Sequence, residues 1–334
     1  MENKFKVICD RDDIRLDAFL SERLSVTRTK AKNMIDGGFV RIAGKSPKPS
    51  MKIRKSLEIE GEIPEEEPLT LTPQAIPIEI LYEDEYFLAV NKPKDMVVHP
   101  SFGHRDGTLV NAVLAYLEER SSQLGTAEFG YRISDIGYGN QNHSSQRALN
   151  SAIRNRQSAI LRPGIVHRLD KGTTGVIIVA KDSKTQEALS ALFKKRGVRK
   201  TYRVITEGVM QKNQGTIEGN IGRHPVDRKK MAVLKEGGRD ASTTFKVIER
   251  LSGFTYIEAY PKTGRTHQIR VHLAHIGYPV AGDDIYGKKA RHITDRPLLH
   301  AYRIEFTHPV KNIPILIEAP VPEDMEEFIG IRKM

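Results

Sequence analysis

Apolar positions recur at helical spacing in the first sixty residues of the chain. The two sets that share a helix face are Leu16, Phe19, Leu20 and Leu24, and then Ala31, Met34 and Ile35. Ser25 or Thr27 can cap the second helix, because short polar side chains accept from the free amides of a first turn. Strand-like segments follow at 39–42 and 56–59. The pattern predicts a small helix-helix-strand module over residues 1–63.

A stretch rich in proline and glutamate follows this module. Residues 64–77 hold four prolines and a run of three glutamates. Proline fixes the backbone and lacks an amide donor, so we predict a linker there rather than a strand or helix.

From residue 78 onward, strand-like and helical patterns are interspersed. Strands are predicted at 78–81, 87–91, 176–180, 201–205, 242–248 and 254–259. Helices are predicted after a Thr108 cap, after a capping box of Ser183 and Gln186, and from about 266 to 276. Residues 78–330 should therefore form one α+β domain with a large mixed, mainly antiparallel sheet and flanking helices. Residues 121–161 turn polar and interrupt the pattern, which predicts a mobile insertion.

Composition narrows the functional classes. Lys and Arg total 53 against 42 Asp and Glu, a formal net charge of +11, which favours a polyanionic partner such as RNA over a membrane. No apolar run is long enough to span a bilayer, and the first residues lack the apolar stretch of a signal peptide. Cys9 is the single cysteine, which excludes an internal disulfide and fits a reducing cytoplasm. We expect a cytoplasmic protein.

One polar loop is a candidate for chemistry. The run from His167 to Gly175 reads HRLDKGTTG and directly precedes the apolar segment 176–180. Asp170 is thus a lone carboxylate at the start of a core strand, flanked by Arg168 and Lys171. By itself the loop leaves two readings open, a catalytic carboxylate or an aspartate that closes a turn.

Several further segments match one family in the same order. They are LAVNKP (88–93), HRLDKGTTG (167–175), KTYR (200–203), TGRTHQIRVH (263–272), PVAGD (279–283) and LHA (299–301). Together they resemble the pseudouridine synthases that modify large-subunit ribosomal RNA and some tRNAs. The N-terminal pattern resembles the RNA-binding module of the ribosomal S-four family, whose second helix meets RNA. Here that helix carries Arg28, Lys30 and Lys32.

The resemblance implies isomerisation of uridine to pseudouridine in structured RNA, with large-subunit rRNA as the expected substrate and tRNA as the alternative. It implies that Asp170 is the essential carboxylate, that Arg270 pairs with it, and that Tyr202 is the active-site tyrosine. Arg168 would fill the gap left by the extruded base. Leu299 would pack on the uracil face. Each of the last three also has a structural reading, as core residue or salt-bridge partner.

No cofactor is expected, because an isomerisation needs no net redox change. The sequence GDDIYGKK at 282–289 spells the P-loop spacing, but Lys289 stands where a serine or threonine should bind magnesium, so no nucleotide cofactor is expected. His272 and His275 share a helix face without a suitably spaced carboxylate, so no metal is expected. A monomer is favoured. The alternative is a catalytically silent RNA-binding or ribosome-assembly factor on the same fold.

Overall fold

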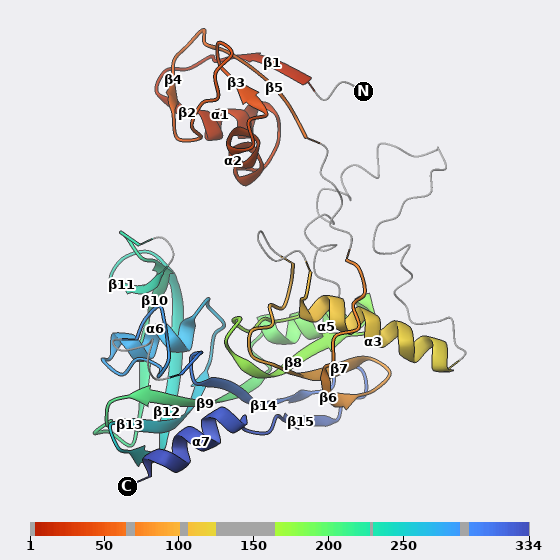
Figure 1. Cartoon of the computed structure of the whole chain (residues 1–334), viewed down its shortest axis with the longest axis vertical. Helices are drawn as coiled ribbons and strands as arrows, with labels where there is room; N and C mark the ends of the chain where they lie inside the picture. The colour runs from red at the N-terminus through yellow and green to blue at the C-terminus, as the bar shows by residue number, and fades with distance from the viewer. Residues whose placement is uncertain are drawn as a thin grey trace. The chain divides into compact units, whose positions relative to one another are not determined.

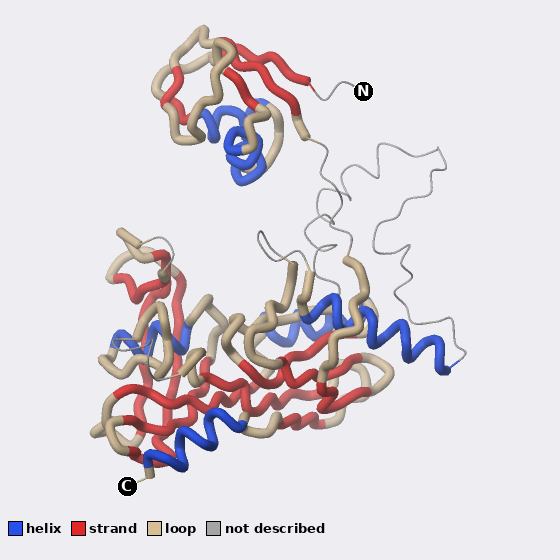
Figure 2. The backbone as a smooth tube through the Cα atoms, viewed as in Figure 1, coloured by secondary structure: helices blue, strands red, loops and turns tan. Residues whose placement is uncertain are grey.

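The computed structural model describes residues 4–64, 71–100, 106–124, 164–227, 230–287 and 294–333. The chain divides into two compact units, Met1–Thr70 and Leu71–Met334 (Figures 1 and 2). Of the predicted insertion, residues 121–124 form the end of helix α3 (Leu109–Leu124), and 125–161 lie outside the described residues.

The N-terminal unit packs two helices against short strands. Its elements are β1 (Lys4–Ile8), β2 (Ile14–Arg15), α1 (Leu16–Arg23), α2 (Arg28–Asp36), β3 (Val40–Arg41), β4 (Lys52–Ile53) and β5 (Glu58–Glu62). The strands pair in the order β1-β5-β3, with β2 on β4. Of the two predicted caps, Thr27 caps α2: its Oγ1 accepts from the backbone N–H of Lys30 at 3.2 Å. The predicted apolar faces of both helices form the core of this unit.

A ten-stranded sheet runs through the described part of the second unit. Its strands are β6 (Glu79–Glu83), β7 (Phe87–Lys92), β8 (Thr174–Ala180), β9 (Arg199–Glu207), β10 (Gln214–Arg223), β11 (Met231–Leu234), β12 (Arg239–Leu251), β13 (Phe254–Pro261), β14 (Leu299–Thr307) and β15 (Pro314–Glu318). Their order is β11-β10-β12-β13-β9-β14-β8-β7-β6, with β15 beside β14. The β14–β8 pair is parallel and the other pairs are antiparallel, which confirms the mainly antiparallel mixed sheet.

Helices cover both faces of the β7–β8 half of this sheet. Alternate residues of β7 point to opposite faces, so Leu88 packs with α3 while Phe87 packs with α5 (Ser183–Lys194). Every residue of β8 is therefore buried. The predicted capping box at Ser183 is wrong by one position, because the side chain of Asp182 accepts from the N–H of Thr185 and is the N-cap.

Two further helices serve the other half of the sheet (Figure 1). Helix α6 (Gln268–His275) packs Ile269 and Leu273 against β9 and β13, and α7 (Glu323–Arg332) packs Met325 and Phe328 against Ile205. No helix in the described part of the chain is long and apolar enough to cross a membrane.

Strand β14 joins the two halves. It lies between β8 and β9, although β8 comes from residues 174–180 and β14 from residues 299–307. At this junction Gly175 has φ of +106°, and a Cβ there would lie 2.2 Å from the carbonyl oxygen of Ala301. Only glycine permits this close approach, and it brings the end of the HRLD loop next to the junction between β8 and β14.

Candidate active site

His167, the first residue of the HRLD loop, anchors the loop to β8 and α5. His167 accepts a hydrogen bond at Nε2 from the backbone N–H of Ile178 in β8, at 2.9 Å, and its ring stacks on Phe193 at 4.6 Å between centroids. Burial lowers the pKa of His167 to about 3, so the ring is neutral and can serve as this acceptor. The N–H of Thr173 closes the turn on the carbonyl of Asp170 at 3.0 Å. The loop backbone is thereby set, and the Asp170 side chain projects from a rigid element.

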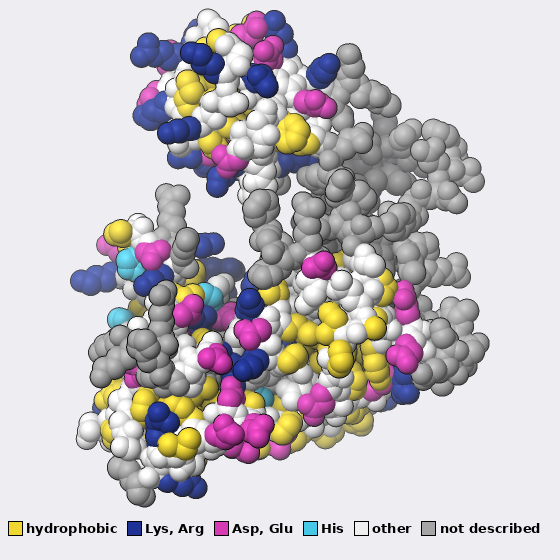
Figure 3. All heavy atoms as spheres, viewed as in Figure 1, with side chains coloured by type: hydrophobic (Ala, Val, Ile, Leu, Met, Phe, Trp, Pro, Cys, Tyr) yellow, Lys and Arg dark blue, Asp and Glu magenta, His cyan; other side chains and the backbone are white. Residues whose placement is uncertain are grey.

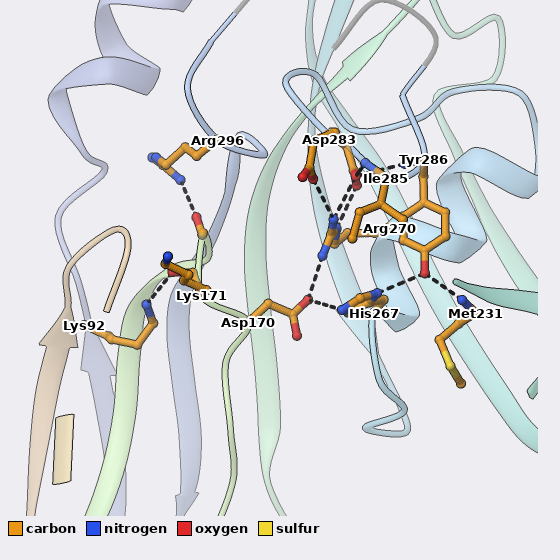
Figure 4. Close-up of polar contacts among 12 residues, drawn as sticks. Lys92, Asp170, Lys171, Met231, His267, Arg270, Asp283, Ile285, Tyr286 and Arg296 are labelled. Carbon is orange, nitrogen blue, oxygen red and sulfur yellow. Dashed lines mark hydrogen bonds and ion pairs between the residues drawn. The ribbon is translucent and has the colours of Figure 1, made fainter. Parts of the chain in front are cut away.

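Two buried basic side chains donate hydrogen bonds to the carbonyls that follow Asp170. Lys92 is completely buried, and its Nζ donates to the carbonyl of Lys171 at 3.0 Å as well as to those of Pro93 and Met96 (Figure 4). Burial lowers the pKa of Lys92 to about 7. Arg296 donates to the carbonyl of Gly172 at 3.3 Å. Both side chains therefore fix the loop by its backbone, without touching the carboxylate.

A cavity of about 540 Å³ opens beside this loop. Its walls include the five residues of the second unit to which the family resemblance assigns a role, namely Arg168, Asp170, Tyr202, Arg270 and Leu299. The side chain of Asp170 is 22% exposed, whereas Leu299 is 4% exposed. Asp170 can thus meet a ligand in the cavity while staying partly shielded from water.

Arg270 connects Asp170 to a second, fully buried carboxylate. Its Nη1 donates to Oδ2 of Asp170 at 3.2 Å, while Nε and Nη2 donate to the two oxygens of Asp283 at 2.7 and 2.8 Å (Figure 4). Burial opposes the charge of Arg270, but the hydrogen bonds and charge of Asp283 outweigh it and raise the pKa of the guanidinium. Asp283 also accepts from the backbone N–H groups of Ile285 and Tyr286, both at 3.0 Å. Asp283 therefore holds Arg270 in place on the side of the guanidinium that faces away from Asp170.

Tyr202 lies on β9, beside β14, and its ring lines the cavity. Burial, and then the charge of Asp170, raise the pKa of the Tyr202 hydroxyl. The tyrosine is therefore a neutral phenol at neutral pH, able to stack and to hydrogen-bond. Leu299 begins β14 and packs in the same apolar cluster as Tyr202. Arg168 is exposed at the cavity wall.

The three basic candidates of the N-terminal unit lie on α2. Arg28 donates to the buried Asp17 at 3.2 Å, and Arg15 donates to the same carboxylate at 2.8 Å. The Arg15 hydrogen bond is the main cause that lowers the pKa of Asp17 to about 2. Lys32 lies 3.9 Å from Asp36 and is mostly exposed, and Lys30 is half-buried. Figure 3 shows Lys and Arg side chains over the visible face of this unit.

Sequence reasoning missed Asp283, Lys92 and the pair of His267 and Tyr286 as parts of the site. Asp283 fell within a motif that we examined for phosphate binding, and its carboxylate instead holds Arg270. His267 lies 3.8 Å from Asp170 through Nε2, and its Nδ1 is 2.9 Å from the Tyr286 hydroxyl. The signal available was the family match itself, since LAVNKP, GRTHQIR and PVAGD contain Lys92, His267 and Asp283.

Comparison with known proteins now decides the family. The model of the RNA pseudouridylate synthase family matches residues 86–275, a span that contains Asp170, Tyr202 and Arg270. The chain belongs to this family. It is an RNA pseudouridine synthase, an isomerase that converts uridine in RNA to pseudouridine. The S4 domain model matches residues 14–59 of this synthase, which confirms the predicted RNA-binding module.

Relatives resemble the synthase over nearly its whole length. A ribosomal large subunit pseudouridine synthase D of Neisseria meningitidis is 35% identical over 333 residues, covering 96% of this chain and 79% of that protein. An RNA pseudouridine synthase of Bacillus subtilis is 36% identical over 321 residues, covering 96% of this chain and 94% of its own. Among solved structures, human RNA pseudouridylate synthase domain containing 1 shares the fold, with a TM-score of 0.57 and 24% identity over 78% of this chain and 89% of that one.

Proposed function

We propose that this pseudouridine synthase modifies large-subunit ribosomal RNA, with Asp170 as its catalytic carboxylate. The observation that carries the proposal is the Asp170–Arg270 pair on the wall of a cavity, with Arg270 clamped in turn by Asp283. Relatives from three bacteria, all 35% identical, are named ribosomal large subunit pseudouridine synthase D. A net charge of +11 supports binding to a large structured RNA. A ribosomal RNA substrate and the single cysteine support a cytoplasmic location in this proposal.

The reaction requires three changes at one nucleotide. The bond between N1 of uracil and C1′ of ribose breaks, the freed uracil turns, and C5 bonds to C1′. C5 then loses its hydrogen as a proton to water and N1 gains a proton from water, so the product is an isomer of uridine. Arg270 contacts only Oδ2 of Asp170, so Oδ1 is left for the substrate (Figure 4). We assign to Asp170 the stabilisation of, or attack on, the ribose carbon that changes partners.

Tyr202, Leu299 and Arg168 fit the handling of the base. The ring of Tyr202 and the side chain of Leu299 offer apolar contacts for the faces of an extruded uracil. The raised pKa of Tyr202 favours a phenol that hydrogen-bonds near C5 over a phenolate base. Arg168, exposed at the rim, suits the gap that the extruded nucleotide leaves in the RNA stack.

Arg28, Lys30 and Lys32 supply the phosphate contacts of the N-terminal module in this proposal. Asp17 orients Arg15 and Arg28 by hydrogen bonds while both guanidinium groups stay about half exposed. Such anchored cations lose less side-chain freedom when they meet a phosphate than free ones do.

Release of tritium from C5 of uridine tests the proposal. RNA labelled at C5 is prepared from cells that lack the protein, and the large-subunit rRNA and tRNA fractions are assayed separately. Wild-type enzyme should release label from rRNA, and Asp170→Asn should release none while binding the RNA with unchanged affinity. Release from tRNA alone would reject the substrate assignment. Undiminished release by Asp170→Asn would reject the catalytic assignment.

The silent assembly factor is disfavoured by the same pair. A protein that only binds RNA does not need a carboxylate and an arginine held together inside a cavity by a second buried aspartate. The substrate assay also addresses this rival, because tight binding to unmodified rRNA with no release of label would be its signature.

A further inference from the structure

His267 occupies an unusual backbone position next to the catalytic loop. It is the N-cap of α6 and has left-handed backbone angles, with φ of 55° and ψ of 22°. Non-glycine residues adopt this conformation at a cost, which other contacts must offset. In this place the ring lies between two groups: Nε2 is 3.8 Å from Oδ2 of Asp170, and Nδ1 is 2.9 Å from the hydroxyl of Tyr286 (Figure 4).

The surroundings of Tyr286 and Asp170 favour one position for the proton on the His267 ring. The hydroxyl oxygen of Tyr286 accepts from the backbone N–H of Met231, at 2.9 Å. When the hydroxyl donates its own hydrogen to Nδ1 of His267, both of these contacts are satisfied at once. The proton of the neutral imidazole then lies on Nε2, which faces the carboxylate. The opposite tautomer would turn the Nε2 lone pair toward a negative charge.

Electrostatics favour the same arrangement. Burial is the main cause that lowers the pKa of His267, while the charge of Asp170 opposes the shift and that of Arg270 adds to it. The ring is therefore neutral near pH 7. A neutral N–H donor beside Asp170 orients the carboxylate without competing with Arg270 for its charge.

Arg270 and His267 approach the same oxygen of Asp170. Arg270 lies 3.2 Å from Oδ2 and His267 lies 3.8 Å from it, and both residues come from α6 or its cap. At 3.8 Å, His267 lies just beyond hydrogen-bond distance of Oδ2, and a small approach on substrate binding would give that oxygen a second donor. Two donors on one oxygen fix the rotation of a carboxylate better than one, and leave the second oxygen for the substrate. Catalytic hydrogen bonds are often long without substrate and shorten when it binds.

We propose that His267 is a positioning residue, held in its Nε2–H tautomer by Tyr286 and by the edge strand β11, and that it orients Asp170 for reaction. The proposal rests on the catalytic role assigned to Asp170. It also links β11 to the reacting carboxylate, because the backbone of Met231 in β11 sets the hydroxyl of Tyr286.

A matched pair of variants isolates the donor. His267→Ala and His267→Gln place residues of similar backbone preference at the same left-handed position, so both meet the same strain. Gln carries an amide N–H that can reach toward Asp170, and Ala carries none. Single-turnover tritium release from rRNA, RNA dissociation constants and melting temperatures are measured for each.

We expect His267→Ala to lower the single-turnover rate constant by about tenfold or more, the effect of one hydrogen bond to a charged group. The dissociation constant for RNA should stay within about twofold, and His267→Gln should recover most of the rate. Equal rates for the two variants, or a rate loss in His267→Ala matched by an equal loss of RNA affinity, would overturn the proposal.

Tyr286→Phe tests the tautomer separately. It keeps the ring, over which the guanidinium of Arg270 lies at 5.3 Å, and removes only the hydroxyl. We expect a rate loss of about two- to tenfold with unchanged RNA affinity. The matched control is Tyr82→Phe in β6, at the opposite end of the sheet, which removes a hydroxyl that donates to Asp84. Identical rates for the two tyrosine variants would overturn the proposed tautomer control.

Asp170→Asn, measured in the same series, separates the positioning role of His267 from the catalytic role of Asp170. An inactive Asp170→Asn beside a fully active His267→Ala would reject the positioning role alone. An active Asp170→Asn would reject the proposed catalytic carboxylate itself.

Discussion

Asp283→Asn should both destabilise the catalytic domain and slow the reaction, although it changes only one atom for another of similar size. In the native site, one oxygen of Asp283 accepts from Arg270 and from two backbone N–H groups, and the other accepts from Nε of Arg270. An amide has one oxygen. In one orientation its NH₂ group faces Nε of Arg270, and in the other it faces Nη2 of Arg270 and both backbone N–H groups, so a donor meets a donor either way.

The magnitude follows from burial. Asp283 is fully buried and the Arg270 side chain is 5% exposed, so the guanidinium keeps its charge and loses its main counterion. Breaking one side of a buried pair costs about 3–5 kcal/mol of unfolding free energy. For a domain of this size that is a fall in melting temperature of about 10 °C. Arg270 would also leave its fixed position beside Asp170. The single-turnover rate constant should therefore fall even at temperatures well below the melting temperature, where the variant is folded.

Thermal unfolding followed by circular dichroism, together with tritium release at 25 °C, measures both effects. Asp284→Asn is the matched control: Asp284 also lies near Arg270, at 3.7 Å, but its side chain is 71% exposed. Solvent screens such a pair, so this variant should resemble wild type. If Asp283→Asn melted and reacted as Asp284→Asn does, the clamp on Arg270 would be dispensable and the reasoning wrong.

Three further predictions concern the catalytic loop, the tyrosine and the RNA-binding module. The pKa of Lys92 falls to about 7 in the folded chain, from 10.5 in the unfolded chain. Between these two pH values the unfolded chain therefore binds one proton more than the folded chain does. The unfolding free energy of wild type, relative to that of Lys92→Met, should then rise with pH by about 1.4 kcal/mol per pH unit. Urea unfolding of both proteins at pH 7 and 9 measures this, and the same free-energy difference at both pH values would contradict it. Tyr202→Phe should slow tritium release and leave RNA affinity unchanged, because the ring remains; weaker binding in a filter assay would point to a recognition role instead. Deleting residues 1–70 should leave a folded catalytic unit whose RNA binding is weaker and less sensitive to salt, and an unchanged salt slope in titrations would argue against phosphate contacts there.

Much of the fold could be predicted from local pattern. Helix α2 shows an apolar face and a threonine cap in its own sequence, so no distant contact was needed to find it. Helix α5 shows where local evidence fails: Asp182 and Ser183 are both good cap residues, and in the structure it is Asp182 that has the extended backbone of a cap and accepts from the N–H of Thr185. The sheet order could not be read, because β8 and β14 pair across more than a hundred residues of sequence.

The candidate site was predicted only where motifs carry the information. Asp170 and Arg270, a hundred residues apart, were paired through the family match, and no periodicity would have brought them together. Asp283 sits in an irregular turn, and its role depends on the three-dimensional course of the loop after β13 and α6. Lys92 ends a strand, and its donation to the carbonyl of Lys171 is a tertiary contact that residue type alone does not reveal.

The placement of β14 has a consequence for when activity can appear during protein synthesis. Asp170, Tyr202 and Arg270 are all translated before residue 299, yet the strand that unites the β8 half with the β9 half comes after them. A nascent chain that ends before β14 has every proposed catalytic side chain. It lacks the strand that pairs with both β8 and β9 and so brings these side chains together. The S4 module, which emerges first, folds around its own core and needs none of these strands. The capacity to hold RNA should therefore precede the capacity to isomerise it by at least the time needed to translate the residues between the S4 module and β14.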